Sequence, residues 1–378
     1  MSEPSPINAP FRPADRHFMA LALALAEQAI GLSDPNPRVG CVLVGPGGNV
    51  IGQGSTQAAG QAHAEVMALR DASAKGYSTQ GATAYVTLEP CAHYGRTPPC
   101  CDALLQAGIA RLVLAVEDPN PKVAGQGRGR LRTGGVHCEV GLMTPEASAL
   151  NVGFLHRMRT GRPWVRLKWA SSLDGRIALP DGRSQWITSA EARRDGQAWR
   201  RRAGAVLTGI GTALADNPRL DVREWPTSCQ PLRVVLDRQL RLPTSARLLA
   251  SPGKALVVHG PGLAAQPIAR LQQAGADLWE APLAEGGRLD LQAILMELGR
   301  REVNELHVEA GSQLNGAWLT ADLVDELLLY LAPRLIGPGQ PPAGLPLLDD
   351  LAGARCWQWL ESQSIGQDLR LRLQRPSD

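Results

Sequence analysis

The segment His63-Ala64-Glu65, read together with Pro90-Cys91 and Cys100, decides the fold of the first half of this 378-residue chain. One imidazole and two thiolates suit Zn²⁺, and three protein ligands leave the fourth tetrahedral position open for water. Zinc lowers the pKa of such a water towards neutrality. Glu65 is not needed as a ligand, so we expect it to move protons between this water and a departing amine.

The order H-x-E, then P-C, then a further cysteine is typical of zinc-dependent base deaminases, whose two cysteines are usually separated by two residues. Here eight residues, Ala92 to Pro99, separate Cys91 from Cys100. A structural zinc site prefers four protein ligands, and Cys101 is available as the fourth. The carboxylate of Glu65 has no task in a structural site, so the pattern favours one catalytic Zn²⁺ per chain. The isolated histidines are interpreted as core-packing residues: His93, His137, His156 and His259.

Strands and helices are expected to alternate around these residues. The patterns predict strands over 39–44, 82–88 and 111–116, and helices over 16–30, 63–72 and 102–106. His63 and Glu65 then lie in the first turn of a helix, and Cys100 lies at the start of another. Helix N-termini favour thiolates electrostatically. An α/β sandwich in which two helix starts meet over one metal follows from this arrangement.

The length of the chain indicates two domains. Apolar residues make up 44% and charged residues 20% of the chain, as in ordinary globular proteins. A helix is predicted over 146–159, and Thr160-Gly161-Arg162-Pro163 is interpreted as a hinge after it. We therefore expect domains of 1–160 and 161–378.

Charge and cysteine content restrict the class of protein. The formal net charge of +3 gives no general argument for nucleic-acid binding. Seven cysteines at irregular spacing argue against a disulfide framework and for a reducing compartment. The N-terminus has no signal-peptide pattern, and the apolar run 18–30 is too short to cross a bilayer. We expect a cytoplasmic protein.

The second half contains further apolar, strand-like runs that alternate with helical patterns. Two of them end in glycine: Val206 to Leu207 precedes Thr208-Gly209-Ile210-Gly211-Thr212, and a later strand ends in Glu309-Ala310-Gly311. Glycine after a buried strand lets the backbone approach a phosphate closely. Two such phosphate-binding sites in one domain are consistent with a bound dinucleotide. The G-x-G-x-x-G fingerprint is absent, so a Rossmann domain is not expected.

Longer motifs surround the metal residues, and a further one opens the second half. They are Asn36-Pro37-Arg38-Val39-Gly40, Thr87-Leu88-Glu89-Pro90-Cys91, Gly95-Arg96-Thr97-Pro98-Pro99-Cys100, Asp118-Pro119-Asn120-Pro121, Val123-Ala124-Gly125 and Lys168-Trp169-Ala170-Ser171-Ser172-Leu173-Asp174-Gly175. With these motifs the chain resembles the RibD family of riboflavin-biosynthesis deaminases along nearly its whole length. That family carries the same gap between its zinc cysteines. The resemblance implies a cytidine-deaminase-like α/β/α sandwich followed by an α/β domain similar to dihydrofolate reductase.

The resemblance also implies two activities in one chain. The first is zinc-dependent hydrolytic deamination of 2,5-diamino-6-ribosylamino-4(3H)-pyrimidinone 5′-phosphate. The second is NADPH-dependent reduction of the ribosyl side chain, which gives 5-amino-6-(5-phospho-ribitylamino)uracil. The implied partner is therefore a small phosphorylated pyrimidine, with neither nucleic acid nor membrane involved. Reductase domains of this family commonly pair, so a homo-oligomer, a dimer or larger, is implied as well.

The resemblance assigns roles to individual residues. Glu65 is the catalytic acid and base, and His63, Cys91 and Cys100 hold the metal. Residues that match cofactor contacts are Ala170, Trp186, Thr212, Asp216 and the segment starting at Gly311; those that match substrate contacts are Ser184, Arg200, Leu220, Arg223 and Glu309. Arg200 and Arg223 suit a clamp on the substrate phosphate. Lys168 and Asp174 are implied in the same pocket, and Arg238 stands where some relatives contact the cofactor with a small hydroxyl residue.

Several points stay open from the sequence. The proton donor of the reduction could be Asp174, Lys168 or Glu309. A deaminase acting on a nucleic-acid base is a rival, although such proteins favour basic, aromatic-lined channels and the aromatic content here is only 4%. A zinc-stabilised scaffold without catalysis is a second rival. A chain in which one of the two halves has lost its activity is a third.

Overall fold

The structure is a computed structural model that describes residues 11–92, 98–120 and 124–376. Contacts between residues divide the chain into two compact units, Met1–Thr160 (unit 1) and Gly161–Asp378 (unit 2). His93, the residues 95–97 of the quoted cysteine motif, and Pro121 and Val123 of the two later motifs lie outside the described residues.

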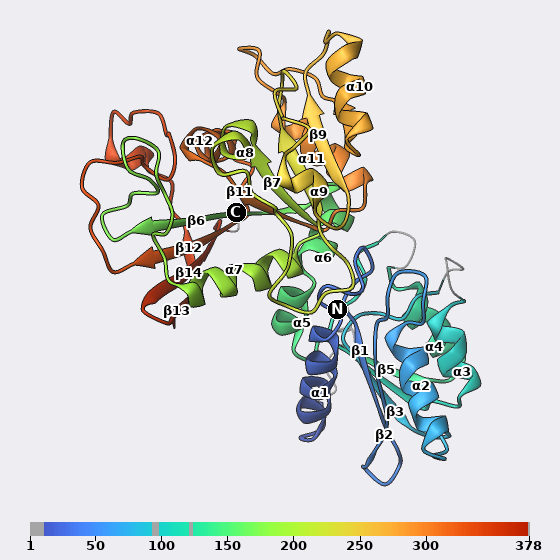
Figure 1. The fold of residues 1–378 in the computed structure, drawn as a ribbon. Coiled ribbons are helices and arrows are strands. Elements are labelled where there is room, and N and C mark those ends of the chain that lie inside the picture. Colours follow the sequence, from blue (N-terminus) through green and yellow to red (C-terminus); the bar gives the residue numbers. More distant parts are fainter. Residues whose placement is uncertain (1–10, 93–97, 121–123, 377–378) are drawn as a thin grey trace, which may run out of the picture. The chain divides into compact units, whose positions relative to one another are not determined.

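Unit 1 alternates helices with short strands (Figure 1). In chain order its elements are α1 (Asp15–Glu27), β1 (Gly40–Val44), β2 (Val50–Ser55), α2 (Ala64–Ala74), β3 (Thr83–Val86), α3 (Cys100–Gln106), β4 (Arg111–Leu114), α4 (Gln126–Thr133), β5 (His137–Val140), α5 (Thr144–Leu150) and α6 (Val152–Thr160).

The sheet of unit 1 has the strand order β2-β1-β3-β4-β5. β1 pairs antiparallel with β2 and β3, whereas β3, β4 and β5 run parallel. α1 and α5 cover one face, and α2, α3 and α4 cover the other (Figure 1). The layers are therefore α/β/α, and the strands and helices expected around the metal residues are present.

Glycines let the helices pack directly onto the strands. A Cβ on Gly40 would lie 1.8 Å from the carbonyl oxygen of Ala22 in α1. On the opposite face, a Cβ on Gly54 would lie 2.4 Å from the carbonyl oxygen of Ala64 in α2. Only glycine fits these positions without displacing a helix. Gly54 thereby sets the height at which the first turn of α2 lies over the sheet.

The helix predicted over 146–159 is wrong at its centre, because it is interrupted at Asn151. The Asn151 side chain is buried and pairs with the backbone of Arg38: its Oδ1 accepts the Arg38 N–H at 2.8 Å, and its Nδ2 donates to the Arg38 carbonyl at 2.8 Å. An asparagine that bonds to a distant backbone competes with helix continuation. The sequence separation of the pair, 113 residues, hides it from local pattern analysis.

Unit 2 is the larger α/β unit. Its elements are β6 (Trp164–Ser172), α7 (Ala190–Arg202), β7 (Ala205–Gly209), α8 (Ile210–Asp216), β8 (Leu232–Leu236), α9 (Arg247–Ala250), β9 (Ala255–His259), α10 (Ala265–Gln273), β10 (Asp277–Glu280), α11 (Leu291–Arg300), β11 (Glu305–Glu309), α12 (Ser312–Thr320), β12 (Glu326–Ala332), the short 3₁₀ helix η1 (Leu351–Gly353), β13 (Gln358–Ile365) and β14 (Asp368–Gln374).

The sheet of unit 2 has the order β10-β9-β8-β7-β11-β6-β12-β14-β13. The strands from β10 to β12 are parallel, and β14 and β13 are added antiparallel at one edge. Alternate residues of β8 belong to cores on opposite faces: Val234 packs with α11 and α12, and Val235 packs with α8 and α10. Both units combine helices with a mostly parallel or mixed sheet, so the α/β class expected for both halves is confirmed.

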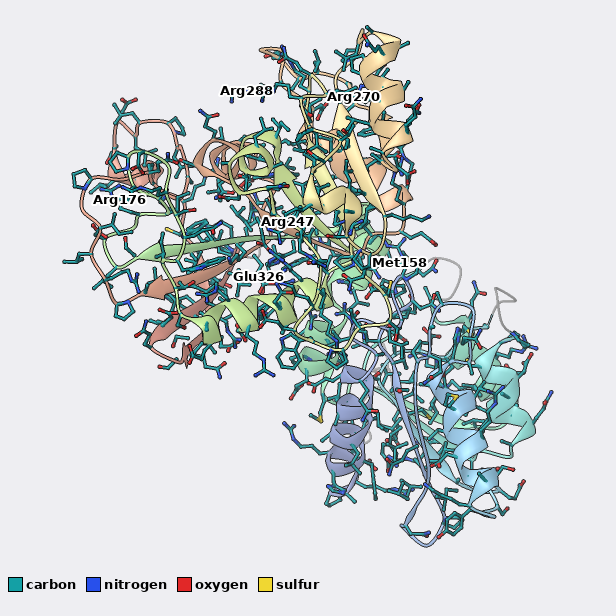
Figure 2. The ribbon with its side chains drawn as sticks, in the orientation of Figure 1. Met158, Arg176, Arg247, Arg270, Arg288 and Glu326 are labelled. Carbon is teal, nitrogen blue, oxygen red and sulfur yellow. The ribbon has the colours of Figure 1, made fainter. Side chains whose placement is uncertain are left out.

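A buried charge network lies within unit 2. Arg166 on β6 is fully buried and forms ion pairs with Glu305 on β11 at 2.9 Å and Glu326 on β12 at 2.8 Å. Figure 2 labels Glu326 in the interior of this unit. The guanidinium of Arg166 also lies 4.6 Å from the centre of the Trp199 ring of α7. A buried arginine is tolerated because both of its charged neighbours are paired to it, and the network fixes α7 against the sheet.

In the part of the chain that the structure describes, no helix has the length and apolar character needed to cross a membrane.

Candidate functional sites

The predicted metal ligands meet at the starts of two helices. His63 is the N-cap of α2 and has an extended backbone conformation, and Glu65 lies in the first turn of that helix. Cys100 is the first residue of α3, directly after Pro99 as its N-cap. Cys91 follows β3 and Pro90, and its carbonyl oxygen accepts the N–H of Cys101. Strand ends and helix starts thus bring residues from three segments to one place.

The distances within this cluster suit one metal ion. His63 Nδ1 lies 3.1 Å from Cys100 Sγ and 3.6 Å from Cys91 Sγ. The three ligand atoms lie within 4.8 Å of one another. Zn–N and Zn–S bond lengths place the ligands of a tetrahedral zinc ion about 3.5–3.8 Å apart. The donor set, one imidazole and two thiols, is that of catalytic zinc sites with an open position, so the residues present fit zinc.

The electrostatics of the cluster are consistent with this assignment. A hydrogen bond from Cys100, together with the nearby His63, lowers the pKa of Cys91 well below its ordinary value, which favours the thiolate. Glu65 is 3% exposed, and burial together with the charge of Cys91 raises its pKa to about 7. A carboxyl group with these neighbours can both accept and release a proton near neutral pH.

The proposed fourth ligand, Cys101, lies outside the cluster. The described residues contain one group of His, Cys, Asp or Glu side chains that could hold a metal, and it consists of His63, Cys91 and Cys100. The Cys101 thiol instead lies 3.9 Å from the Asp102 carboxylate. The alternative of a closed structural site therefore finds no support. Of the histidines interpreted as packing residues, His259 is buried, but the interpretation is wrong for His137, whose side chain is 66% exposed.

Glu89 is a residue whose role the sequence did not reveal. Its buried carboxylate accepts the backbone N–H groups of Asp118 at 3.3 Å, Gly125 at 3.0 Å and Arg128 at 3.0 Å. Since Glu89 precedes Cys91 by two residues, it ties the metal-binding loop to the segment after β4. Asp118 in that segment is itself buried, and burial raises its pKa to about 6.

A second cluster lies in unit 2, where β6 and β11 run side by side. Lys168 and Glu309 are paired positions on these strands. Glu309 accepts hydrogen bonds from Arg200 of α7, with Nε···Oε1 at 2.5 Å and Nη2···Oε2 at 2.8 Å. Burial lowers the pKa of Lys168, whereas the Arg200 guanidinium holds the pKa of Glu309 well below its usual range. The Lys168 Nζ lies 5.7 Å from the centre of the Tyr330 ring.

Arginines extend this cluster through Asp221. The Asp221 carbonyl accepts from Arg200 Nη1 at 3.2 Å, and its carboxylate pairs with Arg219 at 2.6 Å and Arg223 at 3.0 Å. Leu220 beside it is buried and has a positive φ of 56°. Nothing in the sequence pattern selects Asp221, apart from its position between the two substrate-matching residues Leu220 and Arg223.

Two of the residues that match cofactor contacts, Thr212 and Gly311, follow the carboxyl ends of central strands. Thr212 lies near the start of α8 after β7, and Gly311 is the N-cap of α12 after β11. A Cβ on Gly311 would lie 3.6 Å from Thr212 Oγ1, so these two residues are neighbours. Gly311 has no side chain to cover the first N–H groups of α12, and such groups suit a pyrophosphate. Asp216 ends α8, and Ala170 lies on β6 opposite Tyr330 of β12.

Three predicted residues lie in the loops around β6. Ser184 and Trp186 belong to the segment between β6 and α7; Trp186 is 61% exposed, and the Arg193 guanidinium lies 4.4 Å from the centre of its ring. Asp174 accepts hydrogen bonds from Ser172 Oγ at 2.5 Å and from the Gly337 N–H at 2.7 Å. These contacts give Asp174 a role in fixing the 336–337 loop.

Comparison with known families finds two matches that together cover most of the chain. Residues 12–116 match the family described as "Cytidine and deoxycytidylate deaminase zinc-binding region". Residues 163–371 match the family described as "RibD C-terminal domain".

Individual relatives are similar over nearly their whole length. The chain is 45% identical to "Riboflavin biosynthesis protein RibD" of Escherichia coli, with 95% of this chain and 99% of that protein covered. It is 42% identical to the protein of the same name from Haemophilus influenzae, with 96% and 97% covered.

Solved structures give the same result. Acinetobacter baumannii RibD superposes with a TM-score of 0.87 at 41% identity, covering 96% of this chain and 99% of that one. A diaminohydroxyphosphoribosylaminopyrimidine deaminase/5-amino-6-(5-phosphoribosylamino)uracil reductase from Thermotoga maritima superposes with a TM-score of 0.84 at 31% identity, with 96% and 99% covered.

Proposed function

Because the chain belongs to the RibD family of bifunctional riboflavin-biosynthesis enzymes, we propose that the two clusters described above are its two active sites. The chain is a zinc-dependent deaminase and an NADPH-dependent reductase. It deaminates 2,5-diamino-6-ribosylamino-4(3H)-pyrimidinone 5′-phosphate and then reduces the ribosyl side chain to give 5-amino-6-(5-phospho-ribitylamino)uracil. The observation that carries the proposal is the convergence of His63, Cys91 and Cys100 beside the buried Glu65.

The deaminase site uses four side chains. His63, Cys91 and Cys100 hold the zinc ion, and Glu65 lies beside them without being needed as a ligand. When bound, zinc acidifies a water molecule, whose oxygen replaces the 2-amino group on the pyrimidine ring. Glu65 accepts a proton from this water and delivers protons to the ring nitrogen and to the leaving ammonia. Its burial suits both tasks, because desolvation raises the pKa of Glu65 to about 7, so that the side chain can both take up and release a proton near neutral pH.

The reductase site is the cluster around Lys168 and Glu309. NADPH supplies the hydride that reduces C1′ of the ribose while the bond from C1′ to the ring oxygen breaks. The released oxygen needs a proton, and of the three candidates Lys168 is favoured. Asp174 is occupied by backbone N–H groups, and Glu309 is held ionised by Arg200. Lys168 is buried, positively charged when protonated, and adjacent to Glu309, which can orient the ribose hydroxyl groups.

The phosphate of the substrate is proposed to bind at Arg223. Arg200 already donates to the Glu309 carboxylate and to the Asp221 carbonyl. Its guanidinium is therefore better suited to orienting Glu309 than to binding the phosphate. Arg223 is 46% exposed and shares Asp221 with Arg219. Two exposed arginines on one carboxylate retain a net positive charge, which a phosphate dianion can neutralise.

We assign deamination to a domain of residues 1–160 and reduction to a domain of residues 161–378. The extents of the two family matches, 12–116 and 163–371, support this assignment. Expression of 161–378 alone tests it: the fragment should reduce the deaminated intermediate but leave the diamino substrate unchanged. Deamination by that fragment would refute the assignment.

The proposed location is the cytoplasm. None of the seven cysteines, all of which the structure describes, forms a disulfide, and Cys229 and Cys356 are exposed. Exposed thiols persist in reducing compartments. Cell fractionation tests this, and recovery of the protein outside the cytoplasmic fraction would contradict it.

A homo-oligomer, a dimer or larger, is proposed from exposed apolar residues and a free strand edge in unit 2. Leu347 is 93%, Leu351 88% and Trp359 66% exposed, and β13, which carries Trp359, is an edge strand. Exposed apolar residues and an unpaired strand edge each favour association. Light scattering should give at least twice the chain mass of 40.4 kDa, and Leu347→Glu should lower it. A monomer at micromolar concentration would refute this proposal.

Product mass spectrometry tests the proposed function itself. Freshly prepared diamino substrate should be converted to the deaminated ribosylamino compound without NADPH, and to the ribityl compound once NADPH is added. Deamination without any NADPH-dependent change would remove the reductase assignment and leave the zinc assignment intact.

A further inference from the structure

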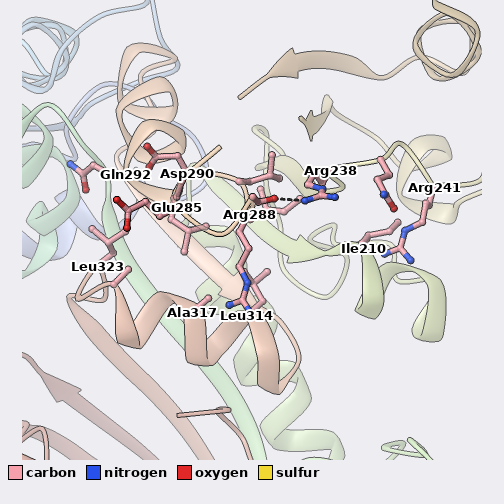
Figure 3. A pocket seen from close by; sticks show the side chains of 17 residues that line it. Ile210, Arg238, Arg241, Glu285, Arg288, Asp290, Gln292, Leu314, Ala317 and Leu323 are labelled. Carbon is pink, nitrogen blue, oxygen red and sulfur yellow. Dashed lines mark hydrogen bonds between the residues drawn. The ribbon is translucent and has the colours of Figure 1, made fainter. Parts of the chain in front are cut away.

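The cavity of about 630 Å³ that Figure 3 shows in unit 2 has Arg238 in its wall and so belongs with the cofactor contacts implied by the family. A buried polar group that the proposed reaction does not use lies elsewhere in this unit. It is the imidazole of His307, at the centre of β11, which is fully buried. Buried polar side chains are nearly always hydrogen-bonded, so a histidine at this position calls for an explanation.

His307 faces the proposed reductase site. Residues two apart on a strand point to the same face of the sheet, so His307 and Glu309 share the face on which Arg200 of α7 binds Glu309. The paired positions on β6 are Arg166 for His307 and Lys168 for Glu309. The imidazole therefore lies beside the carboxylate that the proposed reaction uses.

The nearest polar contact of His307 is the Glu309 carboxylate. Its Nε2 lies 3.3 Å from Glu309 Oε1, slightly longer than an ordinary N–H···O hydrogen bond. Its Nδ1 has no hydrogen-bond partner among the described residues. A proton on Nε2 points towards the anion, whereas a lone pair on Nε2 would face another lone pair. The tautomer with its proton on Nε2 is therefore the favoured one.

The imidazole of His307 is kept neutral by its surroundings. Burial lowers its pKa, and the guanidinium groups of Arg166 and Arg200 act in the same direction, whereas Glu309 opposes them. A neutral imidazole has one N–H to donate, and here it is directed at Glu309. His307 can therefore orient the carboxylate without replacing Arg200 as its counter-charge.

The two oxygens of Glu309 have different surroundings. Oε1 accepts Arg200 Nε at 2.5 Å and faces His307, whereas Oε2 accepts Arg200 Nη2 at 2.8 Å. Within the part of the chain that the structure describes, no other donor binds Oε2. The Glu309 side chain is 18% exposed. Oε2 therefore keeps a lone pair with which it can accept a hydroxyl group.

We propose that His307 is a positioning residue of the reduction, whose Nε2–H holds Oε1 of Glu309 so that Oε2 accepts a ribose hydroxyl group of the substrate. This inference rests on the proposed reductase site, in which Glu309 orients the ribose. Two points of attachment, Arg200 and His307, restrict the carboxylate to one orientation before the substrate binds, which lowers the cost of ordering it. Because His307 is fully buried, its contribution passes through Glu309 and not through contact with the substrate.

Substitutions of different reach test this in the full-length, zinc-loaded protein. His307→Leu removes the N–H and fills the space. His307→Gln returns an N–H donor at about the reach of Nε2, whereas His307→Asn keeps an amide only at about the reach of Nδ1. The control is His259→Leu, which removes the other histidine of unit 2, a buried one on β9 whose Nδ1 lies 2.8 Å from the Gly260 carbonyl oxygen.

The readout is the reduction of the deaminated intermediate, followed by NADPH oxidation. His307→Leu should lower kcat/KM for the intermediate about tenfold, in keeping with the loss of one hydrogen bond to a charged group, while KM for NADPH stays within about twofold. His307→Asn should behave like His307→Leu, and His307→Gln should recover most of the loss. The control should keep KM for the intermediate. An unchanged kcat/KM in His307→Leu, or an equal loss in His307→Gln, would overturn the proposal.

A double-mutant cycle shows whether His307 acts through Glu309. On the Glu309→Gln background, His307→Leu should change kcat/KM less than about twofold, because the carboxylate that His307 orients is already absent. A purely structural role would lower kcat/KM by the same factor on both backgrounds, and that result would overturn the proposal.

The acid limb of the pH profile is an independent readout, because Glu309 must be ionised to accept a hydroxyl group. Burial would raise the pKa of Glu309, but Arg200, His307 and Lys168 together hold it well below its usual range. Tyr330 of β12 also faces this carboxylate. Loss of the His307 contact should raise the pKa of Glu309, so the acid limb of kcat/KM should move to higher pH in His307→Leu and not in the control. An acid limb that stays in place would overturn the proposal.

The fate of the underlying site is read separately. If the wild type does not reduce the intermediate with NADPH, the reductase assignment fails together with this inference. If Glu309→Gln keeps the wild-type kcat/KM, the proposed contact between Glu309 and the ribose fails, and the role of His307 fails with it. If Glu309→Gln is impaired and His307→Leu is not, the reductase site stands and only the role of His307 is refuted.

Discussion

Glu309 on β11 holds the guanidinium of Arg200 on α7 in a two-point ion pair, with oxygen–nitrogen distances of 2.5 and 2.8 Å. Both residues match substrate contacts of the family, and the structure shows that they first bind each other. The pair is mostly buried, with side chains 13% and 18% exposed. Removing one partner of such a pair leaves the charge of the other buried and uncompensated. Substitution of either residue should therefore disturb the other as well.

Lys168→Met is expected to lower kcat of the reduction by about 10²-fold or more, since a positioned proton donor contributes about 10²–10⁴-fold. Deamination should be unaffected, because Lys168 lies in unit 2. Rates are measured by NADPH oxidation with the deaminated intermediate as substrate. Lys168→Arg keeps the charge and should retain substrate binding. Full activity of Lys168→Met would contradict the assignment.

Lys168 also predicts the pH dependence of the reduction. Burial lowers the pKa of Lys168 from its ordinary value, so its proton is lost at lower pH than that of an exposed lysine. The reduction should therefore slow as the pH rises through the alkaline range. In Lys168→Met this alkaline limb should disappear from the profile of kcat, whereas a purely structural role would leave its position unchanged.

Glu65→Gln is expected to abolish deamination while zinc stays bound. The amide keeps the size of the side chain but cannot accept the proton, which corresponds to a loss of about 10²–10⁴-fold in rate. Zinc content is measured by mass spectrometry of the metal and should stay near one per chain. Loss of zinc from this variant would mean that Glu65 stabilises the metal site instead of moving protons.

The two adjacent cysteines should respond differently to substitution. Cys100→Ser removes a proposed ligand and should lower zinc occupancy and deaminase activity together. Cys101→Ser should keep both, because its thiol lies outside the ligand cluster. Equal zinc loss in the two variants would indicate that Cys101 coordinates the metal in solution.

Gly54→Ala should lower deaminase activity by displacing the helix that carries Glu65. The added Cβ would lie 2.4 Å from the carbonyl oxygen of Ala64 and must displace the first turn of α2, which carries Glu65. Overpacking of this kind costs about 1–3 kcal/mol. All nine tryptophans lie in unit 2, so their fluorescence should be unchanged. Gly47→Ala in the β1–β2 turn, where the nearest atom lies 3.4 Å away, should leave deamination intact.

The stability of unit 1 should fall in acid through Asp15. Its carboxylate binds Arg111 at 2.7 Å and accepts a hydrogen bond from Tyr85, and these contacts, together with the Arg12 N–H, lower its pKa to about 2 against burial. Because the folded pKa is below the unfolded value, the stabilisation is complete above about pH 4 and is lost as the pH falls to about 2. It amounts to about 2 kcal/mol. Hydrogen exchange of the β3 and β4 amides should show this loss in the wild type and a flatter pH dependence in Asp15→Asn.

The sequence was sufficient to select the three residues that the structure brings together as proposed metal ligands, because each lies at a recognisable boundary. His63 precedes an amphipathic helix, Cys91 follows a buried strand and proline, and Cys100 begins another helix. Local patterns therefore located all three. The exclusion of Cys101 required coordinates, since neighbouring residues at the start of a helix point in different directions.

The reductase pocket was less accessible to sequence analysis. Arg200 and Glu309 are 109 residues apart, and their pairing depends on the order of strands in the sheet. The sequence pattern alone predicted strand-like runs in the second half without their order in the sheet, and residue roles came from the resemblance. The same limit hid the interruption at Asn151 and the loop-fixing role of Glu89, because the partners of both residues are backbone groups distant in the sequence.

The most direct test of two separate active sites is product mass spectrometry on Glu65→Gln and Lys168→Met side by side. With NADPH present, Glu65→Gln should leave the diamino substrate without deamination, yet convert added deaminated intermediate to the ribityl compound. Lys168→Met should accumulate the deaminated intermediate and stop there. If either single variant, while correctly folded, abolished both reactions, or if neither blocked its own step, the assignment of two independent sites to this chain would be contradicted.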